Sequence, residues 1–566
     1  MSAISNFITS KKRLSIFSII LNLKAFRCVF LFFIAPIIVY SLSYKANIDG
    51  MVDFFHEGEF LVPLNSMSHG ELPFKDIYIQ QGLLHNAGIP YLGGYVFGNT
   101  LYGVRRIQSM IKPLDAVAIY FLGMVLFRCR LILVLPFILF ICWTEYPGRL
   151  FIGIASSACF AMTLRNPENQ VQKTTWWIFF SGFFSGFCFW HSLEIGIYSF
   201  FAIFVFLLIK IILSTSGMFR ANILSLVIFI AGALLGFACF ACYFFIHGGL
   251  QAFFDNVRIQ LSTQLETWGL AYPNLRYAFY PIKQKGWIKG FYEFCMGKHG
   301  RWYIPMIILL VTEVYLVFRW LSGKLLQTQT DRGLLFLFLL GAVYYRSALG
   351  RSEVGHLFYA DIFRILILFF VLDSLLTLVI TDFKASYENR DKQNKFITST
   401  ATLFLVAWIV FTCSRPISAE NYHKKTQDVD CGPYVSGQTL NGLGDVQIPQ
   451  CQYKHIAAMV SFIHQKTSSE MRIFDFSSQA AYLFFADRLS ASPFFHGIYA
   501  STPALQYKVI EDLKRHNVNL VIYRSGQHYD AVDGVSSEIR HQILSNYILT
   551  HYPQKHIVDG VLILTK

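Results

Sequence analysis

The sequence predicts a polytopic α-helical membrane protein with a small α/β domain at its C-terminal end. Of its 566 residues, 54% are hydrophobic and only 14% are charged, whereas soluble domains carry about 25% charged residues. Apolar stretches of about 17–25 residues, long enough to cross about 30 Å of hydrocarbon, recur over residues 1–413. Residues 414–566 instead carry short, strand-like apolar segments between helical patterns, which is typical of an α/β domain.

About eleven transmembrane helices are expected in residues 1–413. They cover 28–44, 116–127, 131–144, 149–164, 176–190, 194–213, 222–246, 303–320, 333–348, 360–380 and 396–413. Lys24 and Arg27 precede the first apolar run, and no small-residue cleavage site follows it. We therefore expect a retained first span and not a removed signal peptide.

Basic residues fall mainly in alternate short loops, which predicts the orientation of the chain. With the N-terminus in the cytoplasm, the cytoplasmic loops hold Arg128 and Arg130, Arg165 and Lys173, Lys210 and Arg220, Arg319, Lys324 and Arg332, and the run 384–395. The long loops 45–115 and 247–302 and the tail 414–566 then lie on the outer side. The net charge of +14 is thus explained by orientation, and nucleic acid is not an expected partner because no basic domain stands apart.

The tail alternates between the two kinds of secondary structure. Strands are expected at 471–476, 519–524 and 560–566, and helices at 453–467, 503–516 and 538–551. Cys431 and Cys451 lie in its polar first part, outside the cytoplasm. They are a candidate disulfide, with two free thiols as the alternative.

Acidic residues follow the first span in VDFFHEGEFL, residues 52–61, which contains Asp53, His56, Glu57 and Glu59. Asp53 and Glu57 are four residues apart, so on a helix they would share a face. One interpretation is a solvated helix end, and the other is a catalytic carboxylate that faces a membrane-borne substrate. The same loop continues with Asp76 and spans about seventy residues, far more than a plain connector needs.

Two further charged clusters are expected on the outer side. The first lies between the spans at 333–348 and 360–380 and contains Arg346, Arg351, Glu353 and His356. Its arginines suit phosphate oxygens, although an intramembrane ion pair that only fixes helix packing is the alternative. The second is His191 and Glu194, which we interpret first as a hydrogen-bonded pair that caps a helical hairpin.

Carboxylates and cations on one side of the membrane suit a reaction in which a base activates an acceptor while cations hold a phosphate leaving group. The sequence has no HExxH, P-loop, GxSxG or paired CxxC motif. Zinc, nucleotide and serine-hydrolase chemistry are therefore not indicated, and no residue is assigned to a metal.

Four segments carry a resemblance to a known family: DFFHEGEFLVP, HGELPFKDIYIQQGLL, GRSEVGHL and the tail from Arg472 to Arg524. They resemble the GT-C fold bacterial membrane glycosyltransferases, including the mannosyltransferase-like and aminoarabinose-transferase-like branches. The resemblance implies a multi-pass protein of the bacterial inner membrane with a periplasmic tail. It implies a polyprenyl-phosphate-linked sugar as donor and a glycan, lipid or protein of the cell envelope as acceptor.

The resemblance also implies roles for residues. Asp53 and Glu57 become the candidate base and its partner, and Glu59 is a weaker candidate. The spacing D-x-x-x-E-x-E departs from the adjacent acids of the mannosyltransferase branch, which leaves the identity of the base open. Arg351 and His356 become donor-phosphate contacts, and the remaining substrate-binding candidates are Arg346, Glu353, His56, Asp76, His191 and Glu194. The resemblance assigns no certain cofactor, and a divalent cation stays open because family members differ in its use.

Two other functions remain open from the sequence. A transporter or flippase of lipid-linked glycans would place charged residues at the bilayer midplane and break helices in corresponding halves. A structural or sensory protein would work through its tail and would need neither the long first loop nor the later arginine cluster.

Overall fold

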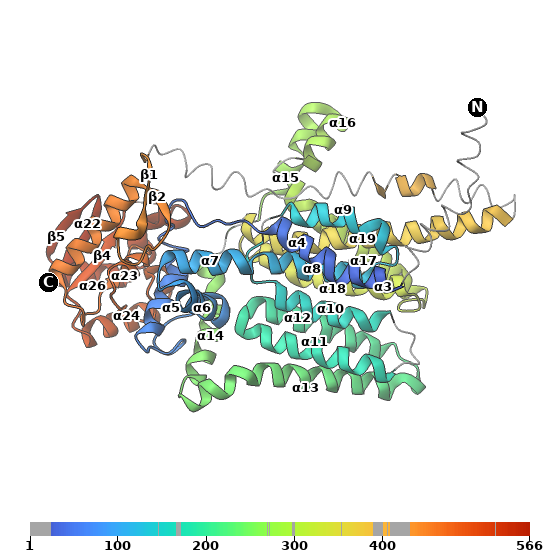
Figure 1. Ribbon diagram of the computed structural model, residues 1–566, viewed down its shortest axis with the longest axis horizontal. Helices are drawn as coiled ribbons and strands as arrows, with labels where there is room; N and C mark the ends of the chain where they lie inside the picture. The colour runs from blue at the N-terminus through green and yellow to red at the C-terminus, as the bar shows by residue number, and fades with distance from the viewer. Residues whose placement is uncertain are drawn as a thin grey trace.

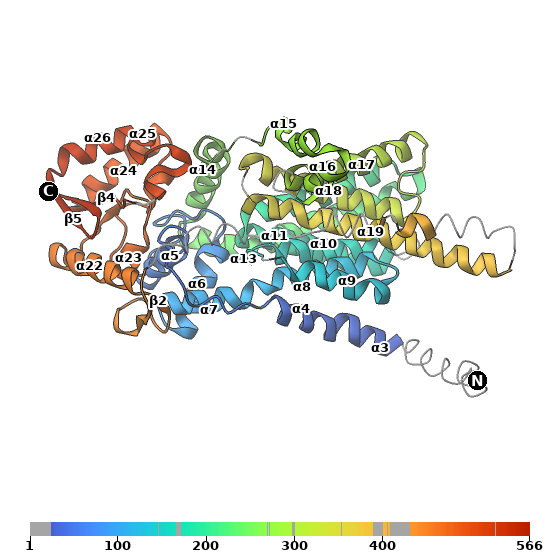
Figure 2. The ribbon, with the colours of Figure 1, turned by 90° about the horizontal axis from the view of Figure 1, so that it is seen from above.

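The computed structural model describes residues 24–144, 146–165, 171–268, 270, 272–296, 300–352, 354–388, 400–404, 406–407, 431–526 and 528–566. Its long helices run side by side along the long axis of the molecule, and the tail is stacked on one end of this bundle (Figure 1). The first helix runs along one side of the bundle, and its start is the end farther from the tail in both views (Figure 2). Glu353 and most of the expected span 396–413 lie outside the described residues.

Each expected span other than 396–413 coincides with a helix of the bundle. These helices are α3 (Lys24–Val29), η1 (Phe30–Ile34), α4 (Ala35–Ser43), α8 (Pro113–Leu126), α9 (Arg130–Cys142), α10 (Phe151–Leu164), α11 (Val171–His191), α12 (Leu193–Ile212), α13 (Ser216–Ile246), α17 (Gly300–Leu321), α18 (Gln329–Gly350) and α19 (Val354–Glu388).

In the described part of the chain, 7 helical segments are long and apolar enough to cross a membrane. They are Phe26–Ser43, Leu101–Leu126, Leu193–Ile212, Ser216–Ile246, Trp302–Leu321, Gln329–Gly350 and Gly355–Phe383. Two shorter apolar helices cover Arg130–Cys142 and Phe151–Leu164. The chain is a multi-pass membrane protein.

The segment Leu101–Leu126 differs from expectation, because α7 (Leu101–Ile111) runs almost directly into α8. The apolar pattern places the start of this span only at residue 116. The first outer loop therefore becomes helical about fifteen residues earlier than its apolar pattern indicates.

Glycines set the closest helix packing in the bundle. Gly182 and Gly186 on α11 face Gly232 and Gly236 on α13, so each helix carries a G-x-x-x-G pattern. A Cβ atom added at Gly186 would meet the backbone oxygen of Ala233 at 1.9 Å. Only glycine lets the two backbones approach this closely, as in other packed membrane helices.

The two long loops fold into helices of their own. The first contains α5 (Gly58–Ser68), η2 (Leu84–Gly88), α6 (Ile89–Phe97) and α7, and the second contains α14 (Leu250–Trp268), α15 (Leu275–Ala278) and α16 (Tyr280–Met296). The loops are joined where Asn256 donates to the carbonyl of Ile79 at 2.8 Å and accepts from its N–H at 3.2 Å. Helix α6 leaves apolar side chains exposed, as expected of a helix at a membrane interface: Tyr91, Leu92, Tyr95 and Val96.

The tail forms a mixed sheet with the strand order β3-β4-β6-β5. Strand β3 is parallel to β4, whereas β6 is antiparallel to both β4 and β5. The strands are β1 (Tyr434–Ser436), β2 (Gln447–Pro449), β3 (Phe474–Asp475), β4 (Leu520–Arg524), β5 (Gln554–Val558) and β6 (Val561–Thr565). The helices are η4 (Gly437–Thr439), α22 (Gln450–Lys466), α23 (Ala481–Phe485), η5 (Gly497–Tyr499), α24 (Pro503–Arg515), η6 (His528–Gly534), α25 (Ser537–Arg540) and α26 (Gln542–His551). Every expected strand and helix of the tail is present, while the sequence pattern does not predict β5 or the β1–β2 hairpin.

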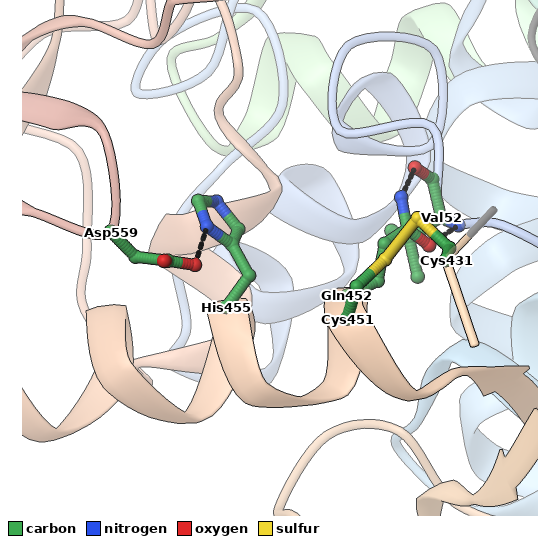
Figure 3. The surroundings of a disulfide bond; sticks show 6 residues. All are labelled: Val52, Cys431, Cys451, Gln452, His455 and Asp559. Carbon is green, nitrogen blue, oxygen red and sulfur yellow. Dashed lines mark hydrogen bonds and ion pairs between the residues drawn. A yellow bond between two sulfur atoms is a disulfide. The ribbon is translucent and has the colours of Figure 1, made fainter. Parts of the chain in front are cut away.

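The tail and the first outer loop share one hydrophobic core, separate from the core among the spans. Gln452 pairs with the backbone of Val52, accepting from its N–H at 2.7 Å and donating to its carbonyl at 3.0 Å (Figure 3). Close by, Cys431 and Cys451 are joined in a disulfide, with their Cα atoms 5.1 Å apart (Figure 3). The tail is therefore packed into the first loop and is not suspended from the bundle by a linker alone.

Candidate functional site

Asp53 lies in a tight turn that precedes α5. Its Oδ1 accepts from the N–H groups of Phe55 and His56 at 3.1 and 3.0 Å, and its Oδ2 lies 2.7 Å from the Nδ1 of His56. Burial raises the pKa of Asp53, but the charge of His56 and the hydrogen bonds from His56 and Phe55 outweigh it and lower the pKa to about 2. Asp53 is therefore ionised, and its side chain is still 41% exposed.

This position corrects one expectation. One interpretation of the acidic residues is a solvated helix end, yet the helix of the first span ends at Ser43 and the chain leaves it in an extended conformation at Tyr44. The acids belong to the outer loop, where the tail packs.

Glu57 is held in a salt bridge by Arg105. The Nε and Nη2 groups of Arg105 donate to the two carboxylate oxygens of Glu57 at 2.5 and 2.9 Å. The same guanidinium donates to the carbonyls of Ile48, Gly50 and Met51. Glu57 also accepts from the N–H of Asp53 at 3.0 Å. This carboxylate consequently fixes the segment that leads into Asp53.

Glu59 is the buried member of the acidic cluster, with 4% of its surface exposed. The hydroxyl of Tyr499, which comes from the tail, donates to its Oε1 at 2.8 Å. Burial raises the pKa of Glu59, opposed by the charge of His56 and by the hydrogen bond from Tyr499. Asp53 and Glu59 thus have different partners and opposite protonation tendencies.

A second cluster forms around Arg149, in the turn between α9 and α10. Asp115 on α8 fixes this turn by accepting from the N–H groups of Gly148, Leu150 and Phe151. The Nε–H of Arg149 donates to the hydroxyl of Tyr359 at 2.6 Å.

Glu194, at the start of α12, connects this cluster with the arginine segment. Its Oε2 lies 3.7 Å from the Nη2 of Arg149, and its Oε1 accepts from Tyr198 at 2.6 Å. His356 and Ser347 also interact with the Glu194 carboxylate. The Oγ of Ser347 lies 2.9 Å from the Nδ1 of His356.

The remaining residues of the arginine segment are placed as follows. Arg346 lies near the hydroxyl of Tyr198. Arg351 directly follows α18, and its N–H donates to the carbonyl of Ser347 at 3.2 Å. Glu353 lies outside the described residues.

His191 and Glu194 do not form the expected hydrogen-bonded pair. The chain is extended at Ser192, with φ −148°, so His191 ends α11 and Glu194 begins α12. The ring of His191 lies against Phe151 and His85, at centroid distances of 4.8 and 6.0 Å. Glu194 turns instead toward Arg149, because an unpaired carboxylate at the end of a span would be costly.

Asp76 forms its hydrogen bonds within its own loop. Its Oδ2 accepts from the N–H of Leu72 at 2.9 Å, and its own N–H donates to the Leu72 carbonyl at 2.9 Å. It closes a turn, and no described contact brings it to the acidic cluster.

Arg149 is the residue that links the two clusters, because its charge acts on Glu59 and it is paired with Glu194. The sequence interpretation does not single it out. One signal was available: Arg149 is the first residue of the expected span 149–164, at the end expected on the outer side, against the positive-inside pattern. Among the described residues, no group of three or more His, Cys, Asp or Glu is arranged to hold a metal ion.

No protein-family model matches the sequence, and no curated protein matches it significantly. Among solved structures, the chain is similar to ArnT from Cupriavidus metallidurans bound to undecaprenyl phosphate, at 12% identity and a TM-score of 0.42, covering 95% of this chain and 97% of that one. It is also similar to an Archaeoglobus fulgidus oligosaccharyltransferase in complex with zinc and sulfate, at 12% identity and a TM-score of 0.40, covering 94% of this chain and 73% of that one. The apo state of the same ArnT gives 10% identity and a TM-score of 0.35. At these values the likenesses assign no activity to this chain.

Proposed function

We propose that the protein is a membrane glycosyltransferase. It would transfer a sugar from a polyprenyl-phosphate donor to a glycan, lipid or protein acceptor on the periplasmic side of the bacterial inner membrane. The observation that supports this most is the proximity of the two clusters: an ionised Asp53 with its histidine, a buried acid at Glu59, and the cation Arg149.

In the proposed reaction, the acceptor hydroxyl attacks the anomeric carbon and displaces the polyprenyl phosphate. The new C–O bond forms as the bond to the phosphate oxygen breaks, so one displacement inverts the anomeric centre. The hydroxyl proton passes to the carboxylate of Asp53, which is ionised and 41% exposed, while His56 holds this carboxylate by a hydrogen bond. Arg351 and His356 stabilise the charge that develops on the departing phosphate.

Glu57 has a positioning role in this proposal. Both carboxylate oxygens of Glu57 are bound by the Arg105 guanidinium and its side chain is 17% exposed, whereas the side chain of Asp53 is 41% exposed and open to an acceptor. The choice between Asp53 and Glu57, open from the spacing, therefore falls on Asp53.

The test uses a strain that lacks the gene, complemented with the wild type, Asp53→Asn or Asp255→Asn. Asp255 is an exposed carboxylate on α14 and serves as the matched control. Mass spectrometry of the cell-envelope glycans is expected to show a sugar that is lost in the deletion, restored by the wild type and the control, and not restored by Asp53→Asn. Full restoration by Asp53→Asn at equal expression would overturn the proposed role of Asp53.

A transporter of lipid-linked glycans is the second candidate. The charges described above lie at helix ends and in loops, whereas a transporter would place them within the spans, which favours the enzyme.

A further inference from the structure

Arg149 is a buried cation whose hydrogen-bonding capacity is only partly used. A guanidinium has five N–H donors, and the contacts among the described residues fill one of them, from Nε to Tyr359. Its distance of 3.7 Å to Glu194 is an ion pair but exceeds hydrogen-bonding range. Only 6% of the residue is exposed.

Arg488 in the tail shows how an equally buried arginine is normally satisfied. It is 7% exposed, and its three nitrogens donate to Thr467, Ala486 and Asp487. Arg149 has the same burial without such partners, so its free donors point to a group that is bound during function.

Other unpartnered polar atoms lie beside Arg149. Both ring nitrogens of His191 and the hydroxyl of Ser192 are buried and have no partner within hydrogen-bonding geometry among the described residues, although the backbone of Gly148 lies near the ring. His191 is close enough to Arg149 to interact with its charge. Glu194 is still 22% exposed, so solvent reaches one member of the ion pair.

The charge of the surroundings favours an anion as this group. His85 lies near Arg149, His191 and Lys112, so two imidazoles and a second cation are among the surroundings of the guanidinium. The carboxylates near Arg149 are Glu194, which is also bound by Tyr198, the buried Glu59, and Asp115, whose oxygens are taken up by backbone N–H groups of the Arg149 turn. A phosphate fits best, because its oxygens accept two parallel hydrogen bonds from the guanidinium fork.

We propose that Arg149 binds the phosphate group of a polyprenyl phosphate, and that Tyr359 and Glu194 are positioning residues that orient its guanidinium. This inference rests on the proposed function. It adds Arg149, in the turn before α10, to the residues that bind the donor phosphate.

The experiment measures thermal unfolding of the full chain in detergent with three probes: a polyprenyl phosphate, the corresponding polyprenol without phosphate, and inorganic phosphate. The variants are Arg149→Gln and Arg149→Lys. Arg319→Gln is the control, because Arg319 is paired with Asp331 at the opposite end of the bundle.

Polyprenyl phosphate is expected to stabilise the wild type and the control. Arg149→Gln should bind it about tenfold or more weakly, since a hydrogen bond to a charged group is lost. Arg149→Lys should fall between them, because it keeps the charge and loses the fork. Equal binding by Arg149→Gln, or equal stabilisation by the polyprenol, would overturn the inference. If inorganic phosphate binds as tightly as the lipid and its binding also depends on Arg149, the bound phosphate group need not belong to a lipid, and the proposed lipid ligand is overturned.

Tyr359→Phe covers the case in which both Arg149 variants fail to fold. It keeps the cation and removes only the hydrogen bond that orients it, so a severalfold weaker binding is expected, and unchanged binding counts against the proposal. The two proposals fail separately. If lipid binding depends on Arg149 but the wild type transfers no sugar, the proposed enzyme activity is rejected. If sugar transfer occurs and the Arg149 variants bind the lipid as the wild type does, the phosphate-binding role of Arg149 is rejected.

Discussion

Asp53 and Glu57 are four residues apart and carry the same functional group, yet their surroundings predict different outcomes of mutation. Replacing Glu57 by Gln leaves the buried Arg105 without a charged partner, which should cost about 3 kcal/mol of stability. Asp53→Asn should change stability less, because that side chain is 41% exposed, while abolishing transfer. Thermal unfolding and a transfer assay on both variants check this, and the reverse pattern would make Glu57 the base.

The buried Glu59 predicts a pH dependence. Its folded-state pKa is raised, so its contribution to stability is fully present below the unfolded pKa of about 4.3 and is lost as pH rises through the folded pKa. Glu59→Gln carries no charge and escapes this loss. The unfolding temperature of the variant minus that of the wild type should therefore increase as pH rises from about 4 to 8.

Comparing the wild type with Glu59→Gln separates the pH dependence due to Glu59 from that of the other acidic residues. Asp475 in the tail, whose pKa burial raises to about 7, titrates in the same range in both proteins and largely cancels in the difference. A difference that stays constant with pH would contradict the assignment of a raised pKa to Glu59.

At this scale the sequence identified Asp53, Glu59 and Glu194 because acidic residues are rare beside apolar runs. It could not divide roles among them, since burial and partners come from distant segments. Arg149 was missed because a single arginine after Pro-Gly resembles any loop residue, and its partners Glu194 and Tyr359 lie far along the chain.

The membrane-spanning helices were predictable because each needs a long apolar run, and such a run is visible in the sequence without knowledge of tertiary contacts. The ends of these helices were less predictable. The continuation of α7 toward α8 depends on packing and capping, which apolar periodicity does not record.

The glycines of α11 predict a steric test. In Gly186→Ala the new methyl group would overlap the backbone of Ala233 on α13, which should cost about 2 kcal/mol or more. Gly217→Ala, on the first turn of α13 with open space around it, is the matched control and should not destabilise. Equal unfolding temperatures for both variants would mean that the two helices are not packed this closely.

The disulfide of the tail predicts a loss of about 3 kcal/mol in Cys451→Ser, because the bond closes a loop with a sequence separation of 20. Cys239→Ser removes an exposed free thiol and should have no such effect. Thiol labelling of the unfolded, unreduced protein gives an independent readout: Cys431 and Cys451 should react only after reduction. Their labelling without reduction would show that the bond is absent.

At the scale of the whole molecule, the shared core of the tail and the first loop is what the sequence did not reveal. Gln452 and Val52 are 400 residues apart, and nothing local in either segment indicates that they pair. The same holds for Tyr499 and Glu59, which are 440 residues apart. Apolar patterns predict which residues are buried but not against which partner they pack.

This arrangement predicts that the tail is needed to hold the acidic cluster in place. A chain that ends at residue 430 should still insert its spans, but Phe54 and the rest of the loop core would lose their packing partners. Limited proteolysis is expected to cut it within residues 45–100, where the full chain resists, and transfer should be lost. In the full chain, Gln452→Ala should produce a weaker form of the same change by leaving the buried N–H and carbonyl of Val52 unpaired, whereas the exposed Gln438→Ala should not. A truncated chain with a protease-resistant first loop would show that this loop folds without the tail, and the site would then belong to the membrane bundle alone.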